Sequence, residues 1–225
     1  MFQGFSQESV DFMWGIRFNN ERTWFEAHKE QYKQHLYGPM RALGDELYVR
    51  FQEQHRELDI IRRVSRIYRD ARRLHGRGPY KDHLWLSMER PAEEWTGQPV
   101  FWFELTPEAY SYGMGFWMAP PVTMAKLRAR IDQDPKPLEQ LARKLDKHPR
   151  LQLEGDEYKR PKGEPSSKVL APWYNKKGFS LGFEGDHEDI LWSHDLVDRL
   201  LEDYEFLLPY YLYMLSLEGD RDPRN

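Results

Sequence analysis

The chain has 225 residues and a net charge of −4; 40% of its residues are hydrophobic, 15% are aromatic and none is cysteine. The lack of cysteine excludes disulfide bonds, thiol nucleophiles and cysteine-ligated metal centres, and the apolar content argues against an intrinsically disordered chain. A mean hydropathy of −0.85 and an isoelectric point near 6.1 argue against a membrane partner and against a surface that binds nucleic acid throughout. Because the chain also lacks a basic and then apolar leader, we expect a cytoplasmic protein.

Three helices are predicted in the N-terminal part of the chain. Apolar residues recur at helical spacing in three segments, residues 6–18, 24–32 and 40–51. Ser6 is a suitable N-cap for the first of these helices. Gly38 and Pro39 predict a break between the second helix and the third, with Pro39 in the first turn of the third.

A sheet is predicted in the middle of the chain. Residues 58–68 form an extended segment, after which apolar residues alternate with other residues, as is typical of strands. The alternating stretches are residues 83–89, 100–105, 110–118, 151–153 and 179–183. Pro107 fits the second position of a tight turn, which favours an antiparallel meander of the first three strands.

Helices return in the C-terminal half. They are predicted over residues 124–131, 135–147 and 193–217. Pro209 lies inside the last of these and predicts a kink, whereas residues 158–171 are rich in turn-forming residues and predict a loop. The order of helices, strands and helices predicts an α+β fold with N-terminal helices, a central mainly antiparallel sheet and a long C-terminal helix. We expect residues 1–225 to form a single domain.

Basic residues concentrate in one window of the sequence. Residues 62–81 contain seven arginines and one lysine against one aspartate, which is a charge of +7 in a chain whose total is −4. So many guanidinium groups require counter-charges, because an unpaired cation in a fold is costly. They pair either with carboxylates of the chain or with an anion that binds to it.

The same window carries a family resemblance. Arg66-Ile67-Tyr68-Arg69-Asp70-Ala71-Arg72, followed by Pro79-Tyr80-Lys81, resembles the signature of the domain-of-unknown-function family numbered 2461, which comprises conserved hypothetical proteins of bacteria and fungi. Other segments stand in the order expected for that family, residues 4–6, 20–25, 112–115, 158–160 and 172–174. The chain departs from the family pattern at residues 73–76, where an aromatic residue usually follows the third arginine. The resemblance implies membership over nearly the whole chain but implies no activity.

The basic window predicts an anion-binding site. Arginine offers a planar fork for phosphate or carboxylate, and lysine adds a mobile point charge. The principal candidates are Arg66, Arg69, Arg72 and Lys81, and further candidates are Tyr80, Tyr158, Lys159 and Arg160. In an enzyme, Asp70 would be the general base or would orient a basic residue. The cofactor and the oligomeric state stay open, and no metal site is predicted because no metal-ligand motif is present.

Two other functions fit the same residues. The basic window and the Tyr158 loop can form one open stripe that binds nucleic acid. Alternatively, the arginines are an internal brace that pairs with Glu46, Glu104 or acidic residues of the C-terminal helix, and a separate surface carries the function. The sequence therefore predicts where charge collects without deciding which partner neutralises it.

Overall fold

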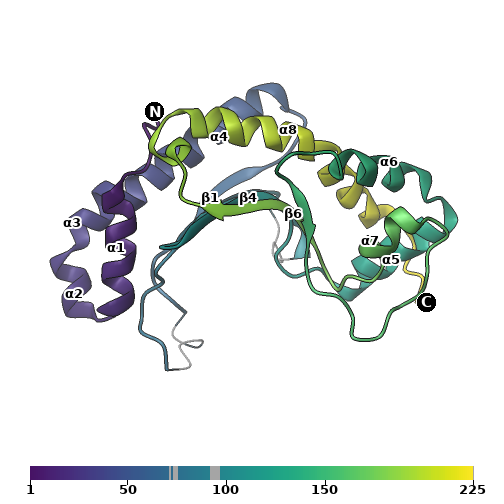
Figure 1. The fold of residues 1–225 in the computed structure, drawn as a ribbon, viewed down its shortest axis with the longest axis horizontal. Helices are drawn as coiled ribbons and strands as arrows, with labels where there is room; N and C mark the ends of the chain where they lie inside the picture. Colours follow the sequence, from purple (N-terminus) through teal and green to yellow (C-terminus); the bar gives the residue numbers. More distant parts are fainter. Residues whose placement is uncertain (71, 73–75, 92–96, 225) are drawn as a thin grey trace. The chain divides into compact units, whose positions relative to one another are not determined.

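The architecture in the computed structural model comprises N-terminal helices, a six-stranded antiparallel sheet and a long C-terminal helix (Figure 1). The structure describes residues 1–70, 72, 76–91 and 97–224. The helices and the sheet together confirm the predicted α+β fold. Within the described residues, no helix is both long enough and apolar enough to cross a membrane.

The chain separates into two compact units, each assembled from distant parts of the sequence. The first unit contains Met1–Met88, Trp102–Tyr112 and Glu184–Glu202. The second unit contains Glu89–Phe101, Gly113–Phe183 and Asp203–Asn225. A single domain over residues 1–225 stays a prediction.

The N-terminal helices follow the predicted segments closely. They are α1 (Gln7–Phe18), α2 (Arg22–Ala27), α3 (Lys29–Gln31), a π-helix (Tyr32–Tyr37) and α4 (Gly38–Gln54). Ser6 precedes α1 as its N-cap, and its backbone N–H donates a hydrogen bond to the Ser9 hydroxyl oxygen at 3.1 Å. This contact satisfies an N–H group at the helix start, where helical partners are missing.

The break predicted at Gly38 and Pro39 is a change of helix type. Pro39 has no N–H group, and its ring would clash with a carbonyl four residues earlier in a regular helix. The π-turn removes that conflict, because the N–H of Gly38 donates to the carbonyl of Lys33. The carbonyl of His35 instead accepts a hydrogen bond from the Ser9 hydroxyl. The helix therefore continues through the proline without interruption.

The sheet has the strand order β1-β2-β3-β4-β6-β5. Its strands are β1 (Ile61–Val64), β2 (Leu84–Glu89), β3 (Pro99–Leu105), β4 (Ala109–Phe116), β5 (Gln152–Glu154) and β6 (Ser180–Asp186). Strands β2, β3 and β4 are neighbours in both sequence and space, so the predicted meander is confirmed. At the edge, β5 and β6 are antiparallel, with Leu153 opposite Leu181.

The C-terminal half supplies four α-helices and three short 3₁₀-helices. The α-helices are α5 (Pro121–Gln133), α6 (Lys136–Leu145), α7 (Ala171–Tyr174) and α8 (Asp195–Ser216), and the 3₁₀-helices are Lys168–Leu170, Asp189–Trp192 and Leu217–Gly219. Pro209 lies inside α8, which continues past it to Ser216. The predicted loop at residues 158–171 is irregular up to the 3₁₀-helix at Lys168–Leu170.

In the first unit, one face of the sheet is covered and packed. Leu84, Leu86 and Phe103 are fully buried. Helix α4 packs on this face, because a Cβ atom on Gly44 would lie 3.5 Å from Leu86. The rings of Phe5 and Phe103 also stack there, with centroids 5.8 Å apart. The opposite face of the same strands carries the residues of the candidate site.

Candidate functional site

Half-buried polar and aromatic side chains occupy the other face of the first unit's sheet. Successive strand residues point to opposite faces, so the residues next to the buried leucines and phenylalanine share this face. We call Lys81, His83, Trp85, Trp102 and Glu104 the sheet-face cluster. All five are intermediate in exposure, whereas their sequence neighbours Leu84, Leu86 and Phe103 are buried. The cluster thus combines ionisable groups with partial access to solvent.

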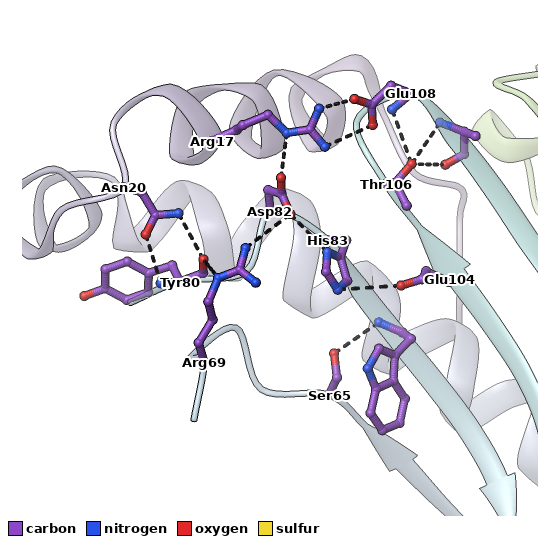
Figure 2. Close-up of polar contacts among 12 residues, drawn as sticks. Arg17, Asn20, Ser65, Arg69, Tyr80, Asp82, His83, Glu104, Thr106 and Glu108 are labelled. Carbon is purple, nitrogen blue, oxygen red and sulfur yellow. Dashed lines mark hydrogen bonds and ion pairs between the residues drawn. The ribbon is translucent and has the colours of Figure 1, made fainter. Parts of the chain in front are cut away.

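Asp82 anchors the cluster to helix α1 (Figure 2). The Arg17 guanidinium donates from Nε to Asp82 Oδ2 at 2.5 Å and also pairs with Glu108, with Nη2 to Oε2 at 3.1 Å. Arg69 lies on the other side, with Nη2 3.8 Å from Asp82 Oδ1. Hydrogen bonds from His83 and Arg17 hold the pKa of Asp82 well below its usual range. Asp82 is therefore an ionised acceptor at neutral pH.

His83 connects Asp82 with Glu104 (Figure 2). Its Nδ1 atom lies 3.0 Å from Asp82 Oδ1, and its Nε2 atom lies 3.7 Å from Glu104 Oε1. Burial raises the pKa of Glu104, and this effect is opposed by His83 and Lys81 and assisted by Glu184 and Asp82. The three side chains form a row from the loop onto the face of strand β3.

Lys81 is the basic member of the sheet-face cluster. Burial lowers its pKa to about 8, and the positive charges of Arg69 and Arg66 act in the same direction. The negative charge of Glu104 opposes them and raises the pKa. Its ammonium lies 5.7 Å from the centre of the Trp85 ring. No residue in the described part of the chain forms a hydrogen bond or an ion pair with this ammonium. Lys81 is therefore a partly desolvated cation whose charge no neighbouring carboxylate neutralises directly.

Backbone pairing fixes the basic segment beside these groups. The N–H of Lys81 donates to Ile67 at 2.7 Å, and the N–H of Arg69 donates to Pro79 at 2.8 Å. Exposure alternates along this segment, because Ile67 is buried and Arg69 half-buried, whereas Tyr68 is 51% exposed. The guanidinium of Arg69 is oriented by its Nε hydrogen bond to the Tyr80 carbonyl at 2.7 Å.

The side chain of Asn20 holds the backbone of Tyr80 in place, an arrangement that we call the Asn20 clamp (Figure 2). Its side-chain amide accepts from the Tyr80 N–H and donates to the Tyr80 carbonyl, both at 2.9 Å. Gly78 makes this possible, because a Cβ atom there would lie 2.2 Å from the Asn20 oxygen. The Tyr80 ring is 3% exposed and stacks on Phe25 with centroids 4.4 Å apart. Tyr80 thus anchors the segment within the hydrophobic core.

The other predicted residues of the basic window lie at the surface. Arg66 is exposed and forms no ion pair with any residue that the structure describes. Arg72 is 89% exposed and bonds Asp70, with Nη2 to Oδ2 at 2.8 Å. Of the principal candidates, Lys81 belongs to the cluster, Arg69 lies beside Asp82, and Arg66 is close enough to act on the pKa of Lys81. Arg72 and Asp70 form a local exposed pair.

The loop that contains Tyr158, Lys159 and Arg160 belongs to the second unit. Tyr158 is flanked by Lys162 and Arg128, whose charged groups lie 4.5 and 5.8 Å from the centre of its ring. Lys159 and Arg160 are exposed. The roles of Tyr158, Lys159 and Arg160 in anion binding stay predictions, and none of these residues belongs to the sheet-face cluster.

Two carboxylates that the brace hypothesis names, Glu46 and Glu104, contact residues outside the basic window. Glu46 accepts from the Phe2 N–H at 2.9 Å and lies 2.6 Å from His194 Nε2. Glu104 faces His83, and Arg62 pairs with Asp45. Within the described residues, no group of three or more histidine and carboxylate side chains is arranged to hold a metal ion.

Sequence reasoning missed three residues that organise the site, namely Arg17, Asp82 and His83. A signal was available for two of them. Asp82 and His83 directly follow the Pro79-Tyr80-Lys81 motif. His83 is two positions after Lys81, a spacing that places both side chains on one face of a strand. No local pattern could reveal Arg17, which reaches Asp82 from a helix 65 positions earlier in the sequence.

The protein has an α+β fold with a six-stranded antiparallel sheet. One face of the sheet carries a half-buried polar cluster that contains lysine, histidine and glutamate. The family model described as "Conserved hypothetical protein (DUF2461)" matches residues 8–213. The chain therefore belongs to this domain-of-unknown-function family, as its motifs predicted. None of the curated proteins compared with the chain matches it.

Proposed function

We propose that this protein binds a small molecule bearing a phosphate or carboxylate group on the open sheet face of its first unit. The observation that carries the proposal is the half-buried ammonium of Lys81, which has no hydrogen-bond or ion-pair partner among the described residues and whose pKa is lowered by Arg69 and Arg66. A cation held partly out of water without a counter-ion is unfavourable. An anion at this position would remove that cost and gain charge-assisted hydrogen bonds.

The surroundings of Lys81 support a ligand of this kind. Arg69 is held in place by the Tyr80 carbonyl, so its remaining N–H groups are oriented before a ligand arrives. Arg66 is exposed and adds a second guanidinium fork. The indoles of Trp85 and Trp102 lie on the same face and offer apolar surface for the uncharged part of the ligand.

Arg72 and Asp70 belong to the outer part of the proposed site. Arg72, oriented by Asp70, is placed to attract an anion over a longer range, where salt screens its effect. Because the chain lacks cysteine, we retain a cytoplasmic location for the ligand and the protein. Nucleic acid offers the same phosphate chemistry, and the experiment below separates it from small molecules.

Thermal unfolding in the presence of an anion panel tests the proposal. The panel contains inorganic phosphate, sugar phosphates, nucleotides, di- and tricarboxylates and short oligonucleotides, each at two salt concentrations. A ligand that binds only the folded state at a hundredfold its Kd adds about 2.7 kcal/mol to stability. We expect a saturable stabilisation by one class of small anion in the wild type and none in Lys81→Met.

A matched surface variant controls for the loss of one positive charge. Lys33 is half-exposed and pairs with Glu30 on the helix surface, so Lys33→Met removes the same charge away from the sheet face. This variant should respond to the anion as the wild type does. Equal responses of Lys81→Met and the wild type, or stabilisation only by oligonucleotides with a steep dependence on salt, would contradict the small-anion site.

A further inference from the structure

The row of Asp82, His83 and Glu104 has the components of an acid–base pair. Asp82 is ionised and only accepts hydrogen bonds, so the His83 nitrogen that faces it at 3.0 Å carries the hydrogen. The other ring nitrogen, Nε2, then faces Glu104 Oε1 at 3.7 Å. A carboxyl group and an imidazole nitrogen therefore face each other across a short gap.

The residues that support this row come from separate elements. Arg17 holds Asp82 from helix α1, and Glu108 holds the far side of Arg17. The turn that contains Glu108 is closed by Thr106, whose hydroxyl oxygen accepts the backbone N–H of Ala109 at 3.0 Å. Such supporting contacts restrict the rotamers of groups that must act on a ligand.

The charges around Glu104 give it a function beyond holding the sheet. The titratable groups that act on it are His83, Lys81, Glu184 and Asp82. Burial raises the pKa of Glu104, so its carboxylate is a stronger base than a solvated one. Lys81 acts on Glu104 electrostatically, and no ion pair joins the two side chains.

We propose that the sheet face is an active site in which Glu104 and His83 move a proton between two atoms of a small anionic substrate. The substrate class is a phosphate- or carboxylate-bearing molecule with a C–H group next to a carbonyl. Lys81, Arg66 and Arg69 bind its charged groups, so this inference rests on the function proposed above. Glu104 and His83 are the catalytic residues, and Asp82 is a positioning residue that orients His83.

The proposed step balances without any other reactant. The Glu104 carboxylate removes the proton from carbon, and the electron pair of the C–H bond forms a carbon–carbon double bond. The carbonyl π-electrons move to oxygen, and the Lys81 ammonium stabilises the resulting enolate charge. The proton then returns from Glu104 to carbon, or passes from Glu104 to Nε2 of His83 and from there to carbon or to the neighbouring oxygen, which regenerates the substrate or gives its isomer.

Exchange of substrate hydrogen with solvent tests this step. Pyruvate, oxaloacetate, 2-oxoglutarate, dihydroxyacetone phosphate and glyceraldehyde 3-phosphate would be incubated with the protein in D₂O, and loss of the C–H signal followed by proton NMR. Thermal unfolding with wild type and Lys81→Met first shows which of these probes bind at Lys81. We expect enzyme-dependent exchange for at least one binding probe, reduced at least about 100-fold in Glu104→Gln.

Two further variants separate catalysis from structure. Glu53→Gln removes an exposed carboxylate of helix α4 and should leave exchange unchanged. Asp82→Asn should slow exchange and move its pH profile while the probe still binds, because the histidine loses its orienting carboxylate. A probe that binds through Lys81 but never exchanges, or exchange that survives in Glu104→Gln, overturns the catalytic inference and leaves the binding function standing. No Lys81-dependent binding by any probe overturns both.

Discussion

Two clusters of the molecule combine an aspartate, a histidine and an arginine, and they use these groups differently. In the second unit, Asp203 is fully buried and receives a two-pronged contact from Arg150, with Nη2 to Oδ1 at 2.8 Å and Nε to Oδ2 at 3.2 Å. His148 lies 3.4 Å from the same carboxylate. In the first unit, Asp82 is joined to Arg17 and His83 at half-exposed positions on the edge of an open face.

The histidines show the difference most clearly. Nδ1 of His148 accepts the backbone N–H groups of Arg150 and Leu151, and its Nε2 faces Asp203, so both ring nitrogens have protein partners. His83 has one nitrogen on Asp82 and directs the other at Glu104 without a hydrogen bond. Lys81, whose ammonium has no hydrogen-bond or ion-pair partner among the described residues, belongs to the same sheet-face cluster as His83. A saturated cluster holds a fold together, whereas an unsaturated one can still bind a ligand.

Removal of the buried aspartate should have the largest effect on stability. Asp203→Ala removes a fully buried carboxylate that pairs with the guanidinium of Arg150, so we expect a loss of about 3 kcal/mol or more in the free energy of unfolding. Urea titration followed by circular dichroism measures this change. Asp198→Ala removes a 61% exposed carboxylate from its pair with Arg50 and should cost about 0.5 kcal/mol or less. Similar losses in the two variants would refute the assignment of Asp203 as a brace.

The half-exposed aspartate should make stability depend on acid pH. The folded pKa of Asp82 is lower than the usual value of 3.8, so its contribution is present above about pH 4 and is lost as the pH falls below that value. After allowance for solvent screening, we expect about 1 to 2 kcal/mol. Urea titrations between pH 2 and 6 should give a steeper fall for the wild type than for Asp82→Asn. Parallel curves would mean that Asp82 is not held by Arg17 and His83.

Lys81→Met should stabilise the protein at neutral pH, in contrast to the loss at Asp203. The folded pKa of Lys81 is about 8 against 10.5 for a solvated lysine, so the unfolded chain binds the additional proton between these values. Stability of the wild type should therefore rise as the pH increases from 8 to 10.5, and the variant should lack this rise. Because the side chain is partly exposed, we expect a gain of about 1 to 2 kcal/mol at pH 7. A loss of stability would instead assign Lys81 to the brace.

The surface pair of the basic window should have the smallest effect. Arg72 is 89% exposed, and its contact with Asp70 spans two positions in one loop. We expect Arg72→Ala to change the free energy of unfolding by no more than about 0.5 kcal/mol. Calorimetric titration with the anion that stabilises the wild type should give at most a modest fall in affinity, larger at low salt. A complete loss of binding would move the centre of the site outward to Arg72.

Local patterns predicted most of the fold, because alternation and helical spacing are properties of neighbouring residues. The meander of β2, β3 and β4 and the helix that starts after Ser6 are examples. The π-helix was missed, since it depends on how Pro39 and a distant hydroxyl on Ser9 share the carbonyls of one turn.

The candidate site was predicted in part for the same reason. The charge of the basic window marked Arg69 and Lys81, but which arginines turn inward is decided by pairing with the strand around Tyr80. The Asn20 clamp and the Arg17–Asp82 contact join residues more than 50 positions apart. Charge alone could not distinguish the half-buried, unpaired Lys81 from the exposed, paired Arg72, because burial is set by the tertiary structure.

The pKa of Lys81 tests the central claim most directly. It can be measured by NMR of labelled lysine side chains, with Lys81→Met to identify the signal and the stabilising anion added in a second titration. The account predicts a pKa of about 8 in the free protein and an upward shift when the anion binds. A pKa near 10.5 in the free protein, unchanged by any anion, would mean that Lys81 is solvated and would contradict the proposed site.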